Sequence, residues 1–370
     1  MTGFLNRLKS FSTFKSTKGV TVPPMDGALK PNQTLELAPT GLFIEQPDNL
    51  VRDGDALLFS SGCVLRSCQP GVTDGMSQEV ARYEAEITAL ACDGAGGYAI
   101  GLDNGDIVFA GTRAQQPSIR LTDTVLSPTA MTFGDQDQLF VCSGSAHNKP
   151  SNWKRDLMER NESGGVWRFD LASGKASCLA TGLAFPYGIM FVRHQNALLI
   201  SESWQHRLVL LEGLESPAKV TIRPVLDDLP GYPARLSLGS SGYWLAVFAP
   251  RSQLVEFVLR EDEYRQRMID SIDPRFWTAP ALSSGLSFLE PMQLGALRVM
   301  GALKPWAPTR SYGLLIHLGD DFQPQGSAHS RSDGKRHGVT SCIEWEEHIW
   351  VASKGGNEIL TLRKADIAED

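Results

Sequence analysis

Four side chains are the first candidates for proton transfer in this chain of 370 residues: His147, His337, Glu45 and Asp48. A histidine changes charge near neutral pH, and a carboxylate can accept a proton or hold a cation, so these residue types suit general acid–base catalysis. No standard motif surrounds them, because the sequence has no H-E-x-x-H, no G-x-S-x-G and no Walker A loop. Their use therefore depends on the elements that bring them together.

The composition excludes several other classes of protein. The net charge of −7 gives no overall field that would attract nucleic acid. Apolar residues make up 42% and charged residues 21%, which is typical of a globular protein. No apolar run approaches the roughly 20 residues that cross a bilayer, so no membrane span is expected. The six cysteines show no C-x-x-C or zinc-type spacing, which favours reduced thiols in a cytoplasmic protein.

The N-terminal segment, residues 1–38, is basic before its first acidic residue. Arg7, Lys9, Lys15 and Lys18 all precede Asp26. A flexible basic segment is expected there, and a targeting sequence is the alternative.

Short apolar clusters recur along the rest of the chain. Their starts are separated by 41, 41, 59, 46 and 105 residues, and they are Leu57–Ser60, Tyr98–Gly101, Leu139–Cys142, Leu198–Ser201, Trp244–Val247 and Ile349–Ala352. Each has the length of a strand and follows another short apolar stretch. Several are followed by a third, namely 106–109, 166–169, 207–210, 254–257 and 358–361.

Three or four short strands in each unit of about 40 residues are typical of propeller blades. We therefore predict an all-β, six-bladed β-propeller over residues 39–370, with its first blade completed by the last strands. A β-sandwich or a pair of sandwiches is the alternative. The segment 261–310 interrupts the repeat and is predicted to be a partly helical cap insertion, with helices at Glu261–Ile269 and Pro291–Lys304. Simple packing on one face of the ring is the other reading.

In a propeller the innermost strands converge on the axis, so polar residues near their starts are candidates for a site. These are Glu45, Asp48, Asn49, Tyr187, Arg235 and Thr340, and Glu202 directly follows the cluster of the fourth blade. His147 and His337 lie in loops near such strands. Each of these residues could instead be a hydrogen-bonded structural residue.

Four stretches of sequence carry a resemblance to known families. The runs at 183–214 (LAFPYGIMFVRHQNALLISESWQHRLVLLEGL), 226–248 (LDDLPGYPARLSLGSSGYWLAVF) and 333–362 (DGKRHGVTSCIEWEEHIWVASKGGNEILTL) resemble the strictosidine-synthase-like family. The run at 47–62 (PDNLVRDGDALLFSSG) is similar to the opening blade of paraoxonases. With the gluconolactonase and SMP-30 proteins, these families share a six-bladed propeller, and the resemblance covers about residues 40–365.

The resemblance also shows where this chain departs from its relatives. Metal-dependent relatives hold a Ca²⁺-type ion on the axis with carboxylate and Asn oxygens. Here one such Asn position is Tyr187, and an Asp-Asn pair is Ala234-Arg235. We therefore expect no cofactor, with Ca²⁺ or another divalent ion as the alternative. The Glu that strictosidine synthase uses at the start of its last blade is Thr340 here.

The resulting hypothesis is a hydrolase of the lactonase or esterase type with a rebuilt axial site and a small-molecule substrate, an anionic one being an option. His337, His147, Glu45 and Asp48 would transfer protons, while Tyr187 and Arg235 would stabilise an oxyanion, with Asn49, Thr340 and Glu202 also contacting substrate. Arg235 is predicted to pair with an axial carboxylate or to bind an anionic substrate group. The alternatives are a non-catalytic propeller that binds a ligand or protein, and a strictosidine-synthase-like lyase or condensing enzyme.

Overall fold

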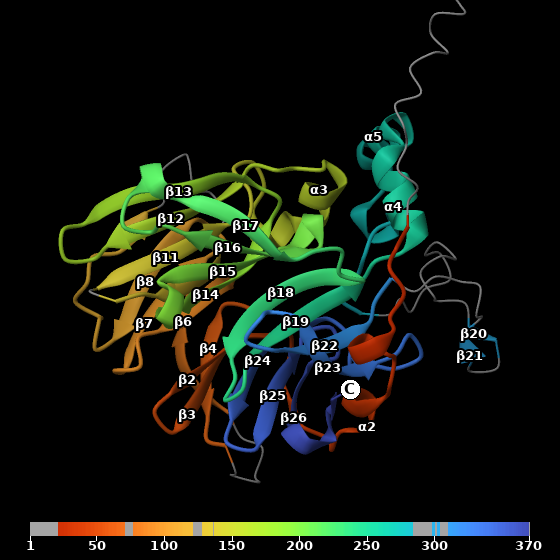
Figure 1. Ribbon diagram of the computed structural model, residues 1–370, viewed down its shortest axis with the longest axis horizontal. Coiled ribbons are helices and arrows are strands. Elements are labelled where there is room, and N and C mark those ends of the chain that lie inside the picture. Colours follow the sequence, from red (N-terminus) through yellow and green to blue (C-terminus); the bar gives the residue numbers. More distant parts are fainter. Residues whose placement is uncertain are drawn as a thin grey trace, which may run out of the picture.

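Six small antiparallel sheets form the blades of a β-propeller, and each blade packs its faces against its neighbours (Figure 1). The computed structural model describes residues 21–70, 77–120, 128–135, 137–283, 298–299, 302–303 and 310–369. All six apolar clusters form the second strands of blades, so the predicted repeat is confirmed. The buried cores between blades consist of these strands, whose side chains are apolar on both faces.

The strands of the first three blades follow chain order from the axis outward. They are β2 (Pro47–Asp53), β3 (Ala56–Ser61), β4 (Val64–Cys68) and β5 (Gln78–Arg82); β6 (Ile87–Cys92), β7 (Gly97–Leu102), β8 (Asp106–Gly111) and β9 (Ile119–Arg120); and β10 (Pro128–Phe133), β11 (Gln138–Ser143), β12 (Gly164–Asp170) and β13 (Lys175–Leu183).

The last three blades differ in their outer strands. They are β14 (Pro186–Val192), β15 (Ala197–Glu202), β16 (Arg207–Glu212) and β17 (Thr221–Leu226); β18 (Gly231–Leu238), β19 (Tyr243–Pro250), β22 (Gly313–Leu318), β23 (Pro324–Ser330) and β27 (Ala368–Glu369); and β24 (Val339–Trp345), β25 (His348–Ser353), β26 (Glu358–Arg363) and β1 (Leu42–Phe43). The ring closes at the sixth blade, where β1 pairs with β26. The predicted closure, in which the last strands complete the first blade, is therefore wrong.

The segment before β1 packs more extensively than expected. The described residues 21–38 include a 3₁₀ turn, Gly27–Leu29, and the short helix α2 (Thr34–Leu37), which lies against β23. Leu35 is fully buried there. Residues 1–20 lie outside the described residues.

Two helices stand where the fifth blade was predicted to have its third strand. Residues 254–257 belong to α4 (Gln253–Arg260), not to a strand, because Ser252 caps a helix whose Val255 and Val258 face the core. The helix predicted at Glu261–Ile269 is confirmed as α5 (Asp262–Ser271). The third strand of the blade is β22, which pairs with β19 across this insertion.

Most of the helix predicted at Pro291–Lys304 falls outside the described residues. Its described parts, β20 (Arg298–Val299) and β21 (Ala302–Leu303), pair as antiparallel strands, so a helix is wrong there. Gly295 and Gly301 both disfavour helix in this sequence. Among the described residues, no helix has the length and apolar character needed to cross a membrane. All six cysteines are free, and a cytoplasmic location stays a prediction.

Candidate functional site

The axial residues are positioned by a bulge that recurs near the start of every inner strand. In β6, β10, β14 and β24 the ladder skips one residue, which is Thr88, Thr129, Tyr187 or Thr340. In β18 it skips Ala234 and Arg235, and in β2 the two residues that follow Asp48. A bulge turns side chains away from the regular pleat, and here it gathers polar groups from all the blades at one end of the axis.

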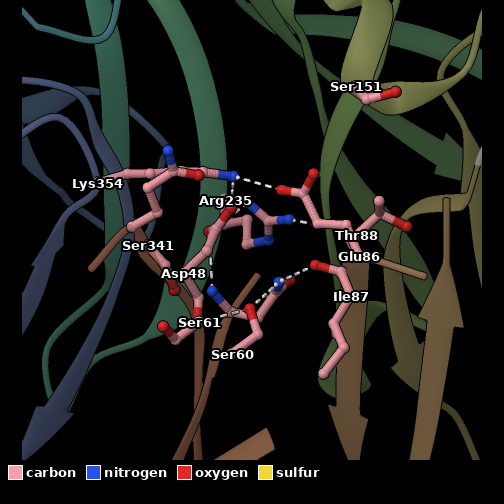
Figure 2. A network of polar contacts seen from close by, with 12 residues as sticks. Asp48, Ser60, Ser61, Glu86, Ile87, Thr88, Ser151, Arg235, Ser341 and Lys354 are labelled. Atoms are coloured by element: carbon pink, nitrogen blue, oxygen red, sulfur yellow. Dashed lines mark hydrogen bonds and ion pairs between the residues drawn. The ribbon is translucent and has the colours of Figure 1, made fainter. Parts of the chain in front are cut away.

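The guanidinium of Arg235 lies at the centre of this gathering (Figure 2). Its Nη1 donates to Asp48 Oδ1 at 2.8 Å, and its Nη2 donates to the carbonyl oxygens of Thr88 at 2.7 Å and Thr129 at 3.3 Å. Its Cζ atom lies 4.6 Å from the ring centroid of Tyr187, which makes a cation–π contact. The ion pair predicted between Arg235 and an axial carboxylate is present, and Arg235 joins blades one to five.

The sixth blade adds a second cation, Lys354, which directly follows β25. Its Nζ donates to Asp48 Oδ2 at 3.4 Å and to Glu86 Oε1 at 3.2 Å. Asp48 is nearly fully buried, whereas the Glu86 side chain is 35% exposed at the rim. The site therefore holds two cations and two carboxylates, and its most accessible charged group is Glu86.

Burial and ion pairing act in opposite directions on these groups. Burial alone would raise the pKa of Asp48, but Arg235 and Lys354 outweigh it and lower that pKa. Burial alone would lower the pKa of Lys354. The nearby negative charges, that of Asp48 above all, outweigh burial, so this pKa is raised. Burial raises the pKa of Tyr187, and Asp48 adds to the effect. At neutral pH the ammonium, the guanidinium and the Asp48 carboxylate are all charged, and Tyr187 is a neutral phenol.

These groups form the charged half of a cavity of about 190 Å³, which we call the axial pocket. Its other half is mostly aromatic, with Trp153, Phe185, Tyr187, Trp204 and Phe248. Gln46, Thr88, Pro150, Ser151 and Leu282 complete the lining. Phe185 stacks on Trp204 with centroids 4.4 Å apart, and it has φ of +54°, a conformation uncommon for a bulky residue. Such strain concentrates at functional sites. The pocket suits a ligand with a planar apolar body and a polar group.

The residues at the axis do not fit a Ca²⁺-type ion. Such an ion needs six to eight oxygen ligands. Asp48, the buried carboxylate at the axis among the described residues, is already bonded to two cations. Within the described part of the chain, no cluster of three or more His, Cys, Asp or Glu side chains could hold a metal.

Of the residues predicted for the site, the structure brings together Asp48, Tyr187 and Arg235. Thr340 is fully buried beside them. Its hydroxyl helps to lower the pKa of Asp48, although no hydrogen bond of good geometry forms with a described residue. Asn49 is buried below the pocket and donates to Ser60 Oγ at 2.8 Å.

The other predicted residues do not reach the axial pocket. Glu45 and His147 are exposed. His337 is buried, with Nδ1 2.8 Å from Ser311 Oγ and Nε2 2.7 Å from the Arg331 carbonyl. Glu202 pairs with Arg207 at 2.7 Å and accepts the Ala184 N–H. None of these side chains lines the axial pocket, so the geometry gives no support to proton transfer there by His337, His147 or Glu45.

Lys354, Glu86 and most of the aromatic wall were missed from the sequence. In an antiparallel sheet the end of the second strand lies beside the start of the first, so Lys354 at the end of β25 belongs to the axial rim. Glu86 directly precedes β6 and could have been found by the rule that found Asp48. Trp153 comes from an insertion between β11 and β12, where no repeat pattern guides a prediction.

Known proteins support the resemblance. No protein-family model matches the chain. It is 33% identical over 101 residues to strictosidine synthase-like 13 protein of Arabidopsis thaliana, which is 27% of this chain and 25% of that protein. It is 26% identical over 283 residues to adipocyte plasma membrane-associated protein of Gallus gallus, which is 67% of this chain and 65% of that protein. The matched part of the chain thus spans a quarter of the length of the first relative and just under two thirds of the length of the second.

Two solved structures share the fold. A calcium-binding protein, regucalcin, from Agrobacterium tumefaciens has a TM-score of 0.53 at 9% identity, over 88% of this chain and 93% of its own. A luciferin-regenerating enzyme has a TM-score of 0.50 at 11% identity, over 91% and 96%. The chain resembles the strictosidine-synthase-like and SMP-30-like propellers. At these identities the two structures support the fold alone.

Proposed function

We propose that the axial pocket binds a small molecule with a planar apolar body and a carbonyl or carboxylate group, and that the chain hydrolyses a lactone or ester there. The observation that supports this proposal most is the pair of cations, Arg235 and Lys354, held at the axis by one buried carboxylate beside an aromatic wall. Fixed cations in a partly dry pocket stabilise developing negative charge on oxygen.

Lys354 is the group that would contact the substrate oxygen. An ammonium has three N–H donors, and two of them meet Asp48 and Glu86 among the described residues. The third is available to a carbonyl oxygen in the pocket. Arg235 lies behind it, held by its own three acceptors, and would add positive potential without moving.

Glu86 is the group that would move the proton. It lines the pocket and is partly exposed, so a water molecule can lie between it and the substrate. In the proposed step Glu86 takes a proton from this water while the water oxygen bonds to the carbonyl carbon of the substrate. The carbonyl oxygen becomes negative beside Lys354. When the carbonyl re-forms, the C–O bond to the alkoxide breaks, and the departing alkoxide takes the proton from Glu86.

A second candidate is binding without catalysis. One observation favours it: both carboxylates of the pocket, Asp48 and Glu86, are already paired with cations, so among its described residues the pocket offers no unpaired carboxylate as a base. The condensing-enzyme alternative has less support, because the start of β24 presents the buried Thr340 and no carboxylate.

One experiment separates these candidates. The experiment compares the wild type with Lys354→Met, Glu86→Gln and the exposed control Lys219→Met. It measures thermal stabilisation and turnover with benzoate, aryl esters, lactones, sugar lactones and aryl amines. Each measurement is made with EDTA and with added Ca²⁺. We expect stabilisation by benzoate that Lys354→Met abolishes and Lys219→Met retains. For the ester or lactone that turns over, we expect a loss of about 100-fold or more in Glu86→Gln, and no effect of EDTA. Binding without turnover supports the second candidate, and activity that requires Ca²⁺ refutes the proposal.

A further inference from the structure

One buried carboxylate near the axial pocket has no role in the proposed reaction. Asp156 lies on helix α3 (Trp153–Met158) and is 0% exposed. No described Lys, Arg or His forms an ion pair with it. Its Oδ1 accepts from Asn148 Nδ2 at 3.0 Å, and its Oδ2 accepts from the indole Nε1 of Trp204 at 2.9 Å. A buried charge without a cation is costly, so its presence calls for an explanation.

The partner of this carboxylate, Trp204, separates two cavities. Trp204 lines the axial pocket and also a second cavity of about 420 Å³, which we call the lateral cavity. On α3, Trp153 lines the axial pocket, and Leu157, one turn later, lines the lateral cavity. Likewise, Phe185 lines the axial pocket and its neighbour Ala184 lines the lateral cavity. The wall between the two cavities is therefore one residue thick.

The two cavities differ in character. The axial pocket is aromatic on this side, whereas the lateral cavity is lined by charged groups, among them Arg160, Arg251, Asp228 and Glu256. An indole N–H in an apolar environment requires an acceptor. A Trp204 ring without the Asp156 acceptor could turn its N–H toward the polar lateral cavity and open the wall.

We propose that Asp156 is a positioning residue that holds Trp204 as a fixed apolar wall and so limits the axial pocket to a small, flat, unhydroxylated ligand body. The hydrogen bond directs the indole N–H toward α3, and the ring then offers the pocket its apolar face, stacked on Phe185. A ligand rich in hydroxyl groups would find no donor or acceptor on this wall. This inference rests on the ligand site proposed above and deepens it.

Three further observations support a fixed wall. The backbone N–H of Trp204 donates to the Ala184 carbonyl at 3.2 Å, and that of Ser203 donates to the Phe185 carbonyl at 3.1 Å. Trp153 lies 6.3 Å from Trp204 by ring centroids. Burial raises the pKa of Asp156, and hydrogen bonds from Ser145, Trp204, Asn148 and Asn161 oppose this effect. The indole is therefore one of the neutral donors that compensate the burial of this carboxyl group.

The test compares Asp156→Asn and Trp204→Phe with the control Glu159→Gln. Glu159 lies directly after α3 and also accepts from Asn148 Nδ2, at 2.8 Å, but its described partners, Asn148 and Arg155, do not include Trp204. The probes are benzoate and the larger 2-naphthoate, with affinity measured by calorimetry. We expect Asp156→Asn and Trp204→Phe each to weaken benzoate about tenfold and to favour 2-naphthoate relative to benzoate. The double variant should lose no more than either single one, and Glu159→Gln should leave both affinities unchanged.

A second readout does not depend on any ligand. The indole N–H proton of Trp204, assigned by its absence in Trp204→Phe, should be shifted downfield and protected from exchange. Its shift should follow the titration of Asp156 in the wild type and in Glu159→Gln, and it should not titrate in Asp156→Asn. Other charged groups near this network, among them Arg155, Glu162 and His206, remain in Asp156→Asn, so a pH response of the indole proton that is lost in this variant belongs to Asp156.

The outcomes are distinct for the two proposals. If neither probe binds the wild type, the proposed ligand site fails, and the indole proton alone decides whether Asp156 holds Trp204. If benzoate binds equally to the wild type, Asp156→Asn and Trp204→Phe, the positioning role is overturned while the ligand site stands. An indole proton that Asp156→Asn leaves unchanged also overturns it.

Discussion

Arg235 and Lys354 bring two positive charges to the axis, and Asp48 is the buried residue that makes this possible. Both oxygens of its carboxylate are engaged, one by each cation. The main-chain N–H of Asn49 adds a third donor, at 2.8 Å from Oδ1. A buried charge is tolerated only with such compensation, so the stability of the fold depends on this one side chain.

The first prediction concerns the loss of that charge. Asp48→Asn leaves two mostly buried cations without their shared partner, and we expect a loss of about 3–5 kcal/mol in the free energy of unfolding at pH 7. Chemical denaturation measures this loss. The surface control Glu79→Gln removes a carboxylate from an exposed pair with Arg82 and should cost less than about 1 kcal/mol.

The pH dependence of this loss follows from the lowered pKa of Asp48. A carboxyl group whose pKa is lower in the folded state than in the unfolded state stabilises the fold above its unfolded pKa, near 3.8. That contribution disappears as the pH falls through the folded pKa. The difference between wild type and Asp48→Asn should therefore be full at neutral pH and shrink below about pH 3.8. A difference independent of pH would show that packing, not charge, accounts for it.

At the scale of elements, the bulges in the inner strands are what convert a repeated fold into a site. Each bulge needs neighbouring strands to approach closely, and Gly188 in β14 shows how closely. A Cβ atom added at Gly188 would lie 2.4 Å from the carbonyl oxygen of Ala234 and 3.0 Å from the Cα of Arg235. The fourth blade thus fixes the backbone that carries the axial guanidinium.

The second prediction follows from this close approach. Gly188→Ala must displace the backbone at Ala234 and Arg235, and we expect a loss of about 1–3 kcal/mol in stability together with at least tenfold weaker benzoate binding. The control is Gly174→Ala. Gly174 has φ of +68°, which an alanine adopts only with strain, but no atom lies within 4 Å of the new Cβ. This control should cost about 1 kcal/mol and leave binding unchanged. Equal effects of the two variants on binding would contradict the role of Gly188.

The sequence predicted these elements well where they repeat and poorly where they do not. Leu57–Ser60 and the five similar clusters lie in regular strands, because a second strand buried on both faces needs a continuous apolar run. The start of an inner strand places Arg235 at the axis, and the cost of an unpaired buried charge predicts its carboxylate partner. Residues 254–257 were misassigned because four apolar-rich residues suit either a strand or a helix, and the capping Ser252 decides between them.

The site was predicted in part for a related reason. Asp48, Tyr187 and Arg235 lie at strand starts, which a repeat pattern locates. His147 and His337 were chosen for their chemistry, and the structure uses one on the surface and the other in a buried hydrogen-bond network. The aromatic wall arises from an insertion and from strand ends of other blades, a tertiary arrangement that spacing along the chain does not encode.

At the scale of the whole molecule, the ring is held closed by the segment that precedes the first blade. This segment runs along the fifth blade and ends in β1 on the sixth (Figure 1). Arg336 is its main anchor. Its guanidinium donates to the carbonyl oxygens of Leu35, Glu36, Ala38 and Pro39 and pairs with Glu358 at 3.1 Å. One buried side chain thus ties residues 35–39 to the strand with which β1 pairs.

The third prediction tests this closure. Arg336→Met leaves the Glu358 carboxylate without its cation and several carbonyl oxygens without their donor, so β1 should detach before the blades unfold. We expect a loss of about 3 kcal/mol or more in the free energy of unfolding, and faster hydrogen exchange in β26 than in the second strands. The control Arg363→Met removes an exposed pair with Asp366 from the end of the same strand and should change neither. Uniformly faster exchange in all blades of Arg336→Met would contradict local opening, because it would mean that the ring has no separable closure and unfolds as one unit.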